Sequence, residues 1–511
     1  MRLLPTMRWP RMMRLRPRPK RAAEQDFFAA SEAAVADTEL RRKLENATGR
    51  HLEHVAATRV EFPPYEAERI ASRRIKEDAI ARLDDLLVQL KERLEANGCH
   101  VFVAADAAEA RKYIVDLARE RGARRVVKGK SMATEEIALN PALAAAGCEV
   151  VETDLGEYIV QLRDERPSHI ITPAIHLSKE DIGILFHQKL DIPYTAEPEA
   201  LTAVARERLR EVFLAADMGV TGANFAIAET GTLVLVENEG NGRMSSMLPE
   251  LFVAVMGIEK VIPALADLSH FLEVLARTAT GQKLTTYTNF ISGPRRAGEA
   301  DGPREVHVVM LDNGRSTMLA DPVLREALYC LRCGACLNVC PIYRRVGGHA
   351  YGSTYPGPIG SIVSPSLFGG ATAALPFAST LCGACREICP VKIDIPRILL
   401  HLRWKETADK GKAGKGDATL PTPIWPRAAR RARSGVRAFS RMAKHPLTVR
   451  MMGRMAALAM WPFARRGYVR WMPPPFGNWT RVRDFPVPRL RGRRKPPRRA
   501  PSNAANNGTQ A

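Results

Sequence analysis

The sequence predicts an α/β domain, a small cysteine-rich module after it, and a basic C-terminal region. Short β-branched runs alternate with helical segments between residues 98 and 315. Seven of the nine cysteines lie in two runs, at 330–340 and 382–389. From residue 401 onward the chain has 26 Lys and Arg against four Asp and Glu, so this segment accounts for the net charge of +21. At 511 residues the chain is long enough for two or three domains.

The first part of the chain predicts a basic extension followed by helices. Residues 1–25 form the extension, and the first 21 of them hold eight Lys and Arg, four prolines and no acid. Such a segment buries too little apolar surface to fold, so we expect it to be disordered. Residues 26–97 are expected to be helical, with an amphipathic helix that ends at Asn97-Gly98. Its apolar residues, expected in the core, are Ile70, Ile75, Ile80, Leu83, Leu87, Leu90 and Leu94.

Residues 98–315 are predicted to form the α/β domain. Alternation of short β-branched runs with helical ones is typical of a mainly parallel sheet covered by helices. A tight turn at Thr230-Gly231 is expected to join two strands within residues 224–238. A helical segment over 134–147 is expected to break near Pro141. The other expected elements are strands at 101–104, 125–128, 149–152 and 169–172 and a helix at 107–122.

Two loops of this domain have features of anion-binding sites. Gly129-Lys130-Ser131 follows an expected strand and precedes a helix, where free backbone N–H groups and the helix dipole favour negative charge. It is not a phosphate-binding P-loop, because Arg124 stands where that motif requires glycine. In the loop 239–243, two glycines allow a ligand to approach the backbone, and Arg243 offers a partner for a carboxylate. For both loops we favour ordinary turn formation over ligand binding.

The cysteine-rich module, predicted at residues 316–400, contains two copies of one cysteine motif, the second of them incomplete. Residues 330–341 read C-x2-C-x2-C-x3-C-P, and residues 382–390 read C-x2-C-x3-C-P, which lacks the first cysteine. Three thiolates at steps of three hold three irons of one [4Fe–4S] cluster, and the cysteine before the proline reaches another cluster. The spacing therefore predicts two [4Fe–4S] clusters. A zinc ribbon or a pair of disulfides is disfavoured, because these need paired C-x2-C units or an oxidising compartment.

Because the cysteine before each proline is expected to bind the cluster of the other run, the spacing also assigns the ligands of each cluster. Ser379 stands three residues before Cys382, at the position of the missing fourth cysteine. A hydroxyl is a much weaker acid than a thiol, so water, a group from a partner or no ligand is expected at that iron rather than a serine alkoxide. The alternative is that Ser379 only begins the turn into the second run. The expected ligands are Cys330, Cys333, Cys336 and Cys389 for the first cluster, and Cys340, Cys382 and Cys385 for the second.

The remaining cysteines and the histidines give no further site. Cys99 and Cys148 each lie beside an expected strand, where a buried, unreactive thiol is favoured over a catalytic one. None of the eleven histidines forms an H-x3-H or H-E-x2-H pair, so we assign no additional metal site. With no signal peptide and with thiols committed to metal, the expected compartment is reducing, and we expect a cytoplasmic protein.

Outside the two runs the module and the C-terminal region are expected to be irregular or basic. The 41 residues between the runs are rich in Gly and Pro, so we expect them to lack long regular elements and to cover the clusters or face a partner. A helix at 397–405 leads into a basic region at 401–488 and a disordered tail at 489–511. No apolar stretch approaches the roughly 20 residues of a membrane span. Nucleic-acid binding is disfavoured, because the tail lacks interleaved aromatic residues and fits a docking or membrane-surface segment equally well.

Six motifs occur together in this chain: GKSMATEE at 129–136, AETGT at 228–232, LRCGAC at 331–336, GGHAYG at 347–352, LCGAC at 381–385 and GNWT at 477–480. In combination they resemble the lactate utilisation protein B family, over roughly residues 25–488. The resemblance implies an α/β fold similar to sugar-phosphate isomerases and coenzyme A transferases, and a ferredoxin-like insert with two [4Fe–4S] sites. It also implies a role in oxidising L-lactate to pyruvate with two companion proteins. The basic extensions at both ends depart from the family pattern.

The function we expect from these features is that of an electron-transfer subunit. Lactate gives up two electrons, a cluster accepts one at a time, and two clusters in one module suit a relay toward an acceptor that the sequence does not identify. No G-x-G-x-x-G fingerprint opens a βαβ unit, so no nicotinamide or flavin is indicated, and we expect an oxidoreductase component that is inactive alone. Two alternatives remain open. One is a metabolite-binding α/β enzyme with structural or redox-sensing clusters, and the other is a redox-responsive nucleic-acid-binding regulator.

Overall fold

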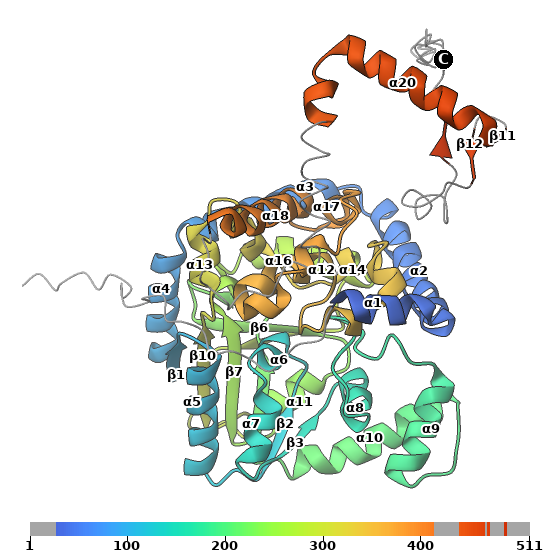
Figure 1. Ribbon diagram of the computed structural model, residues 1–511. Helices are drawn as coiled ribbons and strands as arrows, with labels where there is room; N and C mark the ends of the chain where they lie inside the picture. Colours follow the sequence, from blue (N-terminus) through green and yellow to red (C-terminus); the bar gives the residue numbers. More distant parts are fainter. Residues whose placement is uncertain (1–26, 413–438, 466–467, 471–484, 488–511) are drawn as a thin grey trace, which may run out of the picture. The chain divides into compact units, whose positions relative to one another are not determined.

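The computed structural model describes residues 27–412, 439–465, 468–470 and 485–487, and the chain divides into two compact units, Met1–Asp417 and Ala418–Ala511 (Figure 1). The predicted disordered segments 1–25 and 489–511 lie outside the described residues, as does part of the predicted basic region 401–488. Among the described residues, no helix is both long enough and apolar enough to span a bilayer.

The N-terminal helical region consists of four helices: α1 (Phe27–Ala36), α2 (Thr38–Val60), α3 (Tyr65–Ala81) and α4 (Leu83–Ala96). The expected end at Asn97 is confirmed, because the N–H of Asn97 caps α4 on the carbonyl of Arg93. The continuous helix expected over residues 70–94 is wrong. The chain breaks at Arg82, since α3 packs on α12 (Leu268–Ala279) while α4 packs on strands β1 (His100–Ala104) and β8 (Val261–Ile262). Ile70 is 38% exposed and does not belong to the core.

The predicted parallel sheet is confirmed and has six strands, all parallel, in the order β1-β10-β7-β4-β2-β3. Three central strands were not named from the sequence: β4 (Met218–Gly222), β7 (Leu251–Gly257) and β10 (Glu305–Leu311). The outer strands β2 (Arg125–Lys128) and β3 (Glu149–Glu152) lie where they were expected. Because all six strands run the same way, their carboxyl ends meet at one edge of the sheet.

Helices connect the strands and cover the sheet. The expected break within 134–147 occurs at Ala138, which adopts a left-handed φ of 50°, and not at Pro141, which lies in the first turn of the following helix, where a proline is tolerated. The helices are α5 (Ala107–Glu120), α6 (Met132–Glu136), α7 (Leu139–Ala145), α8 (Leu155–Leu162), α9 (Lys179–Leu190), α10 (Pro198–Leu214), α11 (Asn241–Met247), η1 (Ile258–Lys260) and α13 (Arg315–Ala320).

The strand predicted at 169–172 does not form. The Nδ1 atom of the buried His169 accepts hydrogen bonds from the backbone N–H groups of Ile171 at 3.1 Å and Thr172 at 3.2 Å. These N–H groups are therefore taken up locally and cannot pair with a neighbouring strand. The segment forms a loop instead, closed by a hydrogen bond from the Ser168 N–H to the Pro173 carbonyl.

A second, four-stranded sheet contains the predicted hairpin. Its order is β8-β5-β6-β9, with β5 (Phe225–Ile227), β6 (Thr232–Glu237) and β9 (Tyr287–Ile291). Strands β5 and β6 are antiparallel, as the turn at Thr230-Gly231 predicts. Gly231 has a φ of 64° and comes so close to α4 that a Cβ atom there would lie 2.6 Å from the carbonyl carbon of Arg93. Figure 1 shows β6 running across the direction of β7, so this sheet lies at an angle to the first.

The cysteine-rich module packs on the same core as both sheets. One cluster of buried apolar side chains extends from the N-terminal helices through β5 and β7 to the two cysteine runs. The segment between the runs was predicted to lack long elements, which is wrong, because its residues Gly357–Phe368 form the 12-residue helix α16. The other elements here are η2 (Leu324–Tyr329), α14 (Ala335–Asn338), α15 (Tyr343–Val346), η3 (His349–Tyr351), η4 (Gly370–Thr372), η5 (Leu375–Phe377), α17 (Ala384–Ile388) and α18 (Ile395–Lys412).

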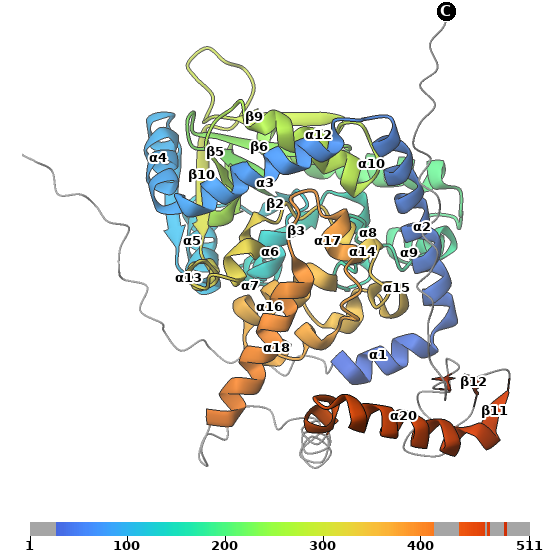
Figure 2. The same ribbon diagram turned by 90° about the horizontal axis from the view of Figure 1, so that it is seen from above.

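Both views place the cysteine-bearing helices beyond one end of the parallel sheet. In Figure 1, α14 and α17, which carry Cys336 and Cys385, lie past the end of β7 that is near β6, together with α16, and Figure 2 shows α14 and α17 in front of the region of β2 and β3. The module therefore covers an edge of the sheet rather than forming a separate lobe.

The predicted helix at 397–405 is confirmed within α18.

The second unit is described only in part. It contains α20 (Pro446–Met460), η6 (Trp461–Phe463) and a small antiparallel sheet of β11 (Ala464–Arg465), β12 (Tyr468–Val469) and β13 (Phe485–Pro486).

A glycine substitution tests the packing of the central strand β4. A Cβ atom at Gly219 would lie 1.7 Å from the carbonyl oxygen of Ser245, so Gly219→Ala forces α11 and β4 apart. We expect a loss of about 3 kcal/mol of stability, measured as a lower midpoint of thermal unfolding. The control is Gly49→Ala in α2, where a Cβ meets nothing within 4 Å. It should be neutral or stabilising by about 0.5–1 kcal/mol, and equal midpoints for the two variants would contradict the packing described.

Candidate functional site

The two cysteine runs adopt the same backbone conformation. In the first run Arg332 and Gly334, on either side of Cys333, have φ values of 62° and 72°. In the second run Leu381 and Gly383, on either side of Cys382, have φ values of 57° and 90°. Positive φ is uncommon for residues with a side chain and is found where a site imposes it. The sequence phrase repeated in the two runs is therefore also a repeated three-dimensional turn.

Most of these thiols are buried and receive backbone hydrogen bonds. Burial raises the pKa of Cys389 to about 11 and that of Cys385 to about 12, so neither thiol ionises readily alone. Backbone N–H groups, however, point at the sulfurs, which favours the thiolate form and is usual around iron–sulfur clusters. They join Arg332 to Cys330 at 3.4 Å, Tyr343 to Cys340 at 3.5 Å and Ile393 to Cys389 at 3.4 Å.

Electrostatic interactions divide the thiols into two groups. Burial is the main cause of the raised pKa of Cys333, and the next causes are the charges of Cys389 and Cys330. For Cys336 the charges of Cys330 and Cys333 follow burial, and Cys385 contributes least. For Cys385 itself, burial is followed by the charges of Cys340 and Cys382. The charges of Cys330 and Cys389 thus act on Cys333, while Cys340 and Cys382 act on Cys385.

The spacing of the sulfurs does not suit zinc. Zinc binds thiolates at about 2.3 Å in a tetrahedron, which places its sulfur ligands about 3.8 Å apart. Among the described residues, the groups of three or more ligand atoms that lie within 4.8 Å of one another contain no cysteine. All nine cysteines are free thiols.

Ser379 occupies the place in the second run that Cys330 occupies in the first. The Oγ atom of Ser379 accepts a hydrogen bond from the N–H of Leu381 at 3.1 Å, as the sulfur of Cys330 does from Arg332. The carbonyl of Ser379 is held by the guanidinium of Arg403 at 2.9 Å. The serine is half-buried, and the neighbouring Cys382 is exposed. The second group of thiols therefore reaches the protein surface.

A pocket of about 400 Å³ lies between the parallel sheet and the first cysteine run. Residues at or just after the carboxyl ends of β2, β4 and β7 line it, which is where open α/β sheets bind ligands. Arg332 and Cys333 of the first run line the same pocket. A ligand in this pocket would therefore contact the loop that carries the first group of thiols.

Both loops that were considered as anion sites line this pocket, through Gly129–Ser131 and through residues 239, 241 and 242. Arg243 was considered as a carboxylate partner, but it is exposed and does not line the pocket. The N–H groups of Gly242 and Arg243 instead donate to the carboxylate of Glu237, at 2.6 and 2.7 Å. The anion at this loop is therefore one of the protein's own side chains.

A buried ion network forms the wall of the pocket next to the first run. The guanidinium of Arg315 donates to both oxygens of Glu136 at 2.9 Å and to Glu259 at 2.5 Å. Tyr355 donates to Glu136 at 2.7 Å, and Arg332 stacks on the Tyr355 ring at 4.4 Å. Burial opposes the charged form of Glu259, but Arg315 and the neighbouring cations lower its pKa to about 2. The sequence reasoning missed this network because its members are distant in the chain, although Arg315 follows the end of a buried strand.

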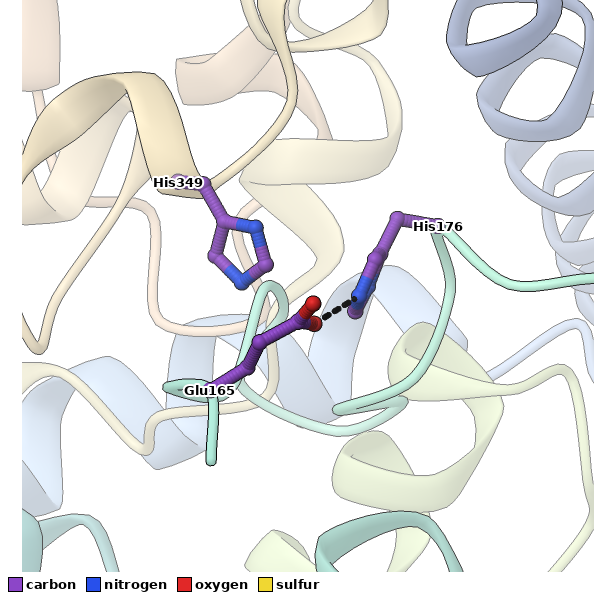
Figure 3. A group of neighbouring side chains, drawn as sticks. All are labelled: Glu165, His176 and His349. Carbon is purple, nitrogen blue, oxygen red and sulfur yellow. Dashed lines mark hydrogen bonds and ion pairs between the residues drawn. The ribbon is translucent and has the colours of Figure 1, made fainter. Parts of the chain in front are cut away.

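A second polar cluster joins the α/β domain to the segment between the runs (Figure 3). Glu165 accepts a hydrogen bond from Nε2 of His176 at 2.8 Å, and the carbonyl of Arg166 accepts one from Nε2 of His349 at 2.7 Å. The ligand atoms of Glu165, His176 and His349 lie within 4.8 Å of one another, which no local histidine spacing predicted. Glu165 also pairs with Arg163 at 2.8 Å. These contacts fix the 347–352 motif to the loop before α9 and leave the buried Nδ1 atom of His176 without a hydrogen-bond partner among the described residues.

A third cluster of ligand-type residues is occupied by an ammonium group. Glu135, Glu152 and Glu157 lie together, and the buried Lys128 ammonium contacts Glu152 at 2.7 Å and Glu135 at 3.1 Å.

Cys99 and Cys148 are both buried, and burial raises the pKa of each thiol, to about 11 for Cys99. These environments are typical of unreactive thiols.

Comparisons with known proteins agree with this architecture. Residues 87–311 match the family described as LUD domain, and residues 326–393 match the 4Fe-4S dicluster domain. The chain therefore has an α/β domain of the LUD type followed by a ferredoxin-like module that binds iron–sulfur clusters. A DUF162 family protein from Deinococcus radiodurans is 17% identical, with a TM-score of 0.25, over 45% of this chain and 98% of that one.

Full-length relatives also match the chain. Lactate utilization protein B of Macrococcus caseolyticus is 43% identical over 472 residues, which cover 92% of this chain and 96% of that protein. The proteins of the same name from Bacillus velezensis and Bacillus subtilis are each 45% identical, over 84% of this chain and 87% and 86% of their own lengths.

Removing the buried guanidinium tests the network beside the first run. Arg315→Met leaves the carboxylates of Glu136 and Glu259 buried without their main counter-charge, which costs about 3–5 kcal/mol. We expect a lower midpoint of urea unfolding and weaker retention of iron. The matched control is Arg121→Met, which removes a partly exposed pair with Glu305 and should cost at most about 1 kcal/mol. A midpoint for Arg315→Met equal to that of the control would contradict this account.

Proposed function

The chain belongs to the lactate utilisation protein B family, and from this premise we propose that it is an iron–sulfur electron-transfer subunit of a multi-protein system that oxidises L-lactate to pyruvate. Conversion of lactate to pyruvate releases two electrons and two protons. Two [4Fe–4S] clusters, when bound, would each accept and release one electron at a time. The observation that supports this role most directly is that the last cysteine of each run interacts electrostatically with the other run, Cys389 with Cys333 and Cys340 with Cys382 and Cys385.

The proposal assigns seven ligands in two sets. Two features support this assignment: backbone N–H groups point at three of the sulfurs, and the same positive-φ turn occurs in both runs. The thiol ligands require a reducing compartment, for which we propose the cytoplasm. The two sets are Cys330, Cys333, Cys336 and Cys389 for one cluster, and Cys340, Cys382 and Cys385 for the other.

The two sets differ in their surroundings, which supports a relay. The first borders the pocket through Cys333, and the second includes the exposed Cys382. A ligand pocket and the protein surface are thus connected by two adjacent groups of thiols. We propose that companion proteins of the lactate system remove hydrogen from lactate and that the surface near Cys382 meets one partner in electron transfer.

A second candidate function is favoured by the pocket. An α/β enzyme that acts on a bound metabolite and uses its clusters only for structure would also place a pocket of about 400 Å³ at the carboxyl ends of β2, β4 and β7. Such an enzyme would keep its activity when its clusters are held in one oxidation state. The electron-transfer subunit would not.

The test of the proposed function is lactate-dependent bleaching of the cluster absorbance under anaerobic conditions. L-lactate added to the purified chain alone should leave the absorbance unchanged, whereas addition of the companion proteins should bleach it. D-lactate serves as the control for substrate specificity. Substantial pyruvate formation by the chain alone with an artificial electron acceptor would overturn the division of labour.

Replacing one ligand tests the crossed assignment. Cys336→Ser should abolish the electron paramagnetic resonance signal of one reduced cluster and lower the iron content by about half, because Cys336 serves only the first set. Cys148→Ser, at a buried free thiol outside both runs, is the matched control and should retain all iron. An unchanged iron content in Cys336→Ser would contradict the assignment of Cys336 as a cluster ligand.

The serine in the second run gives a separate prediction. We expect one iron of the second cluster to lack a cysteine ligand and to be the first lost on mild oxidation, which leaves a three-iron cluster. Electron paramagnetic resonance should detect the three-iron signal in the unmodified protein and lose it in Ser379→Cys, where a thiol replaces the hydroxyl that now accepts the Leu381 N–H. Two equally oxidation-resistant clusters in the unmodified protein would refute this idea.

A further inference from the structure

One end of the pocket contains a cation with an unused donor. Arg332 is buried, with its side chain 9% exposed, and the nearest carboxylate oxygen paired with it, Oε1 of Glu259, lies 3.7 Å from its Nη2 atom. Its Nη1 atom is buried and, within the described part of the chain, has no hydrogen-bond partner. A buried guanidinium normally uses its donors, so an unpartnered one in the wall of a pocket points to a ligand.

A second cation lies at the same end of the pocket. Lys260 ends η1, directly after β7, and it lines the pocket with its side chain half-buried. No hydrogen bond or ion pair joins its ammonium to any residue in the described ranges. Arg332 also lines the pocket, and its Nη2 atom lies 3.7 Å from Oε1 of Glu259, the residue that precedes Lys260 in the chain. The two cations therefore share one location beside the first cysteine run.

The two carboxylates beside this pair give most of their oxygens to other groups. Glu136 is fully engaged by Arg315, Asn313 and Tyr355. Glu259 gives one oxygen to Arg315 at 2.5 Å and reaches Arg332 only at 3.7 Å. Two buried or half-buried cations next to an unfilled volume favour an anion that supplies acceptor oxygens.

We propose that this end of the pocket binds the carboxylate of a small 2-hydroxy or 2-oxo acid between Arg332 and Lys260. The guanidinium and ammonium groups suit a carboxylate, because an arginine presents paired donors and a lysine a point charge. Thr221 and Asn224 line the pocket too and offer polar groups for a hydroxyl or keto oxygen. The choice of acid rests on the proposed function, whereas the anion site rests only on the two cations and the pocket.

The experiment is anaerobic isothermal titration calorimetry of the cluster-loaded chain with L-lactate and with pyruvate as probes. Both acids should bind, and Lys260→Gln should weaken binding at least about tenfold, the loss of one charge-assisted hydrogen bond. The matched control is Lys112→Gln, whose exposed ammonium pairs with Asp116 outside the pocket, and it should bind like the unmodified chain. Iron content is measured for each variant.

Further outcomes keep the proposal open to refutation. L-lactamide, which has the shape of lactate without its charge, should not bind the unmodified chain, so the need for a carboxylate is tested even where Lys260→Gln loses iron. Absence of binding by both acids, or equal binding by Lys260→Gln with full iron content, would overturn the proposal and leave the cations with the role of balancing the cluster's charge. Binding is measured without companion proteins and without electron transfer. The anion site can therefore be refuted even if lactate-dependent bleaching is observed, and the reverse is also true.

Discussion

A single buried guanidinium, that of Arg315, fixes the cysteine-rich module against the end of the parallel sheet. It holds Glu136 of α6 and Glu259 of η1, and through these carboxylates it reaches Tyr355 and Arg332 of the module. An ion network of this kind is costly to desolvate and costlier to break, because each partner left alone would be a buried charge. The network therefore specifies one arrangement of sheet, pocket and first cysteine run, and the apolar core that all three share provides the stabilisation.

This arrangement places different chemistry at the two groups of thiols. The group containing Cys333 borders a pocket lined by Lys260 and by Arg332, whose Nη1 atom has no hydrogen-bond partner among the described residues, and the group containing Cys382 reaches the surface beside Ser379. Both groups use the same turn, in which one cysteine is flanked by two residues with positive φ and a backbone N–H donates to the side chain at the position of Cys330 or Ser379.

Local chemistry made part of the structure predictable. The spacing of the cysteines predicted an iron–sulfur module, in agreement with the match to the 4Fe-4S dicluster domain. The β-branched runs predicted β2 and β3, and Thr230-Gly231 predicted the hairpin, because each depends on neighbours in the chain. The strand expected at 169–172 failed because one side chain, His169, takes the backbone N–H groups that a sheet would need. Strand β4 contains two glycines, and one of them is needed for the approach of Ser245, which only the folded structure reveals. The Arg315 network joins residues 56 and 179 positions apart, so no local pattern indicated it, whereas two loops that line the pocket were recognisable in the sequence as possible anion sites.

The central claim is that seven cysteines from two runs hold two [4Fe–4S] clusters within one folded unit. Iron and acid-labile sulfide analysis combined with Mössbauer spectroscopy, on protein reconstituted without oxygen, tests it most directly. The account predicts about eight iron and about eight sulfide per chain, all in four-iron clusters. About four iron per chain, or zinc in stoichiometric amount with no sulfide, would contradict it.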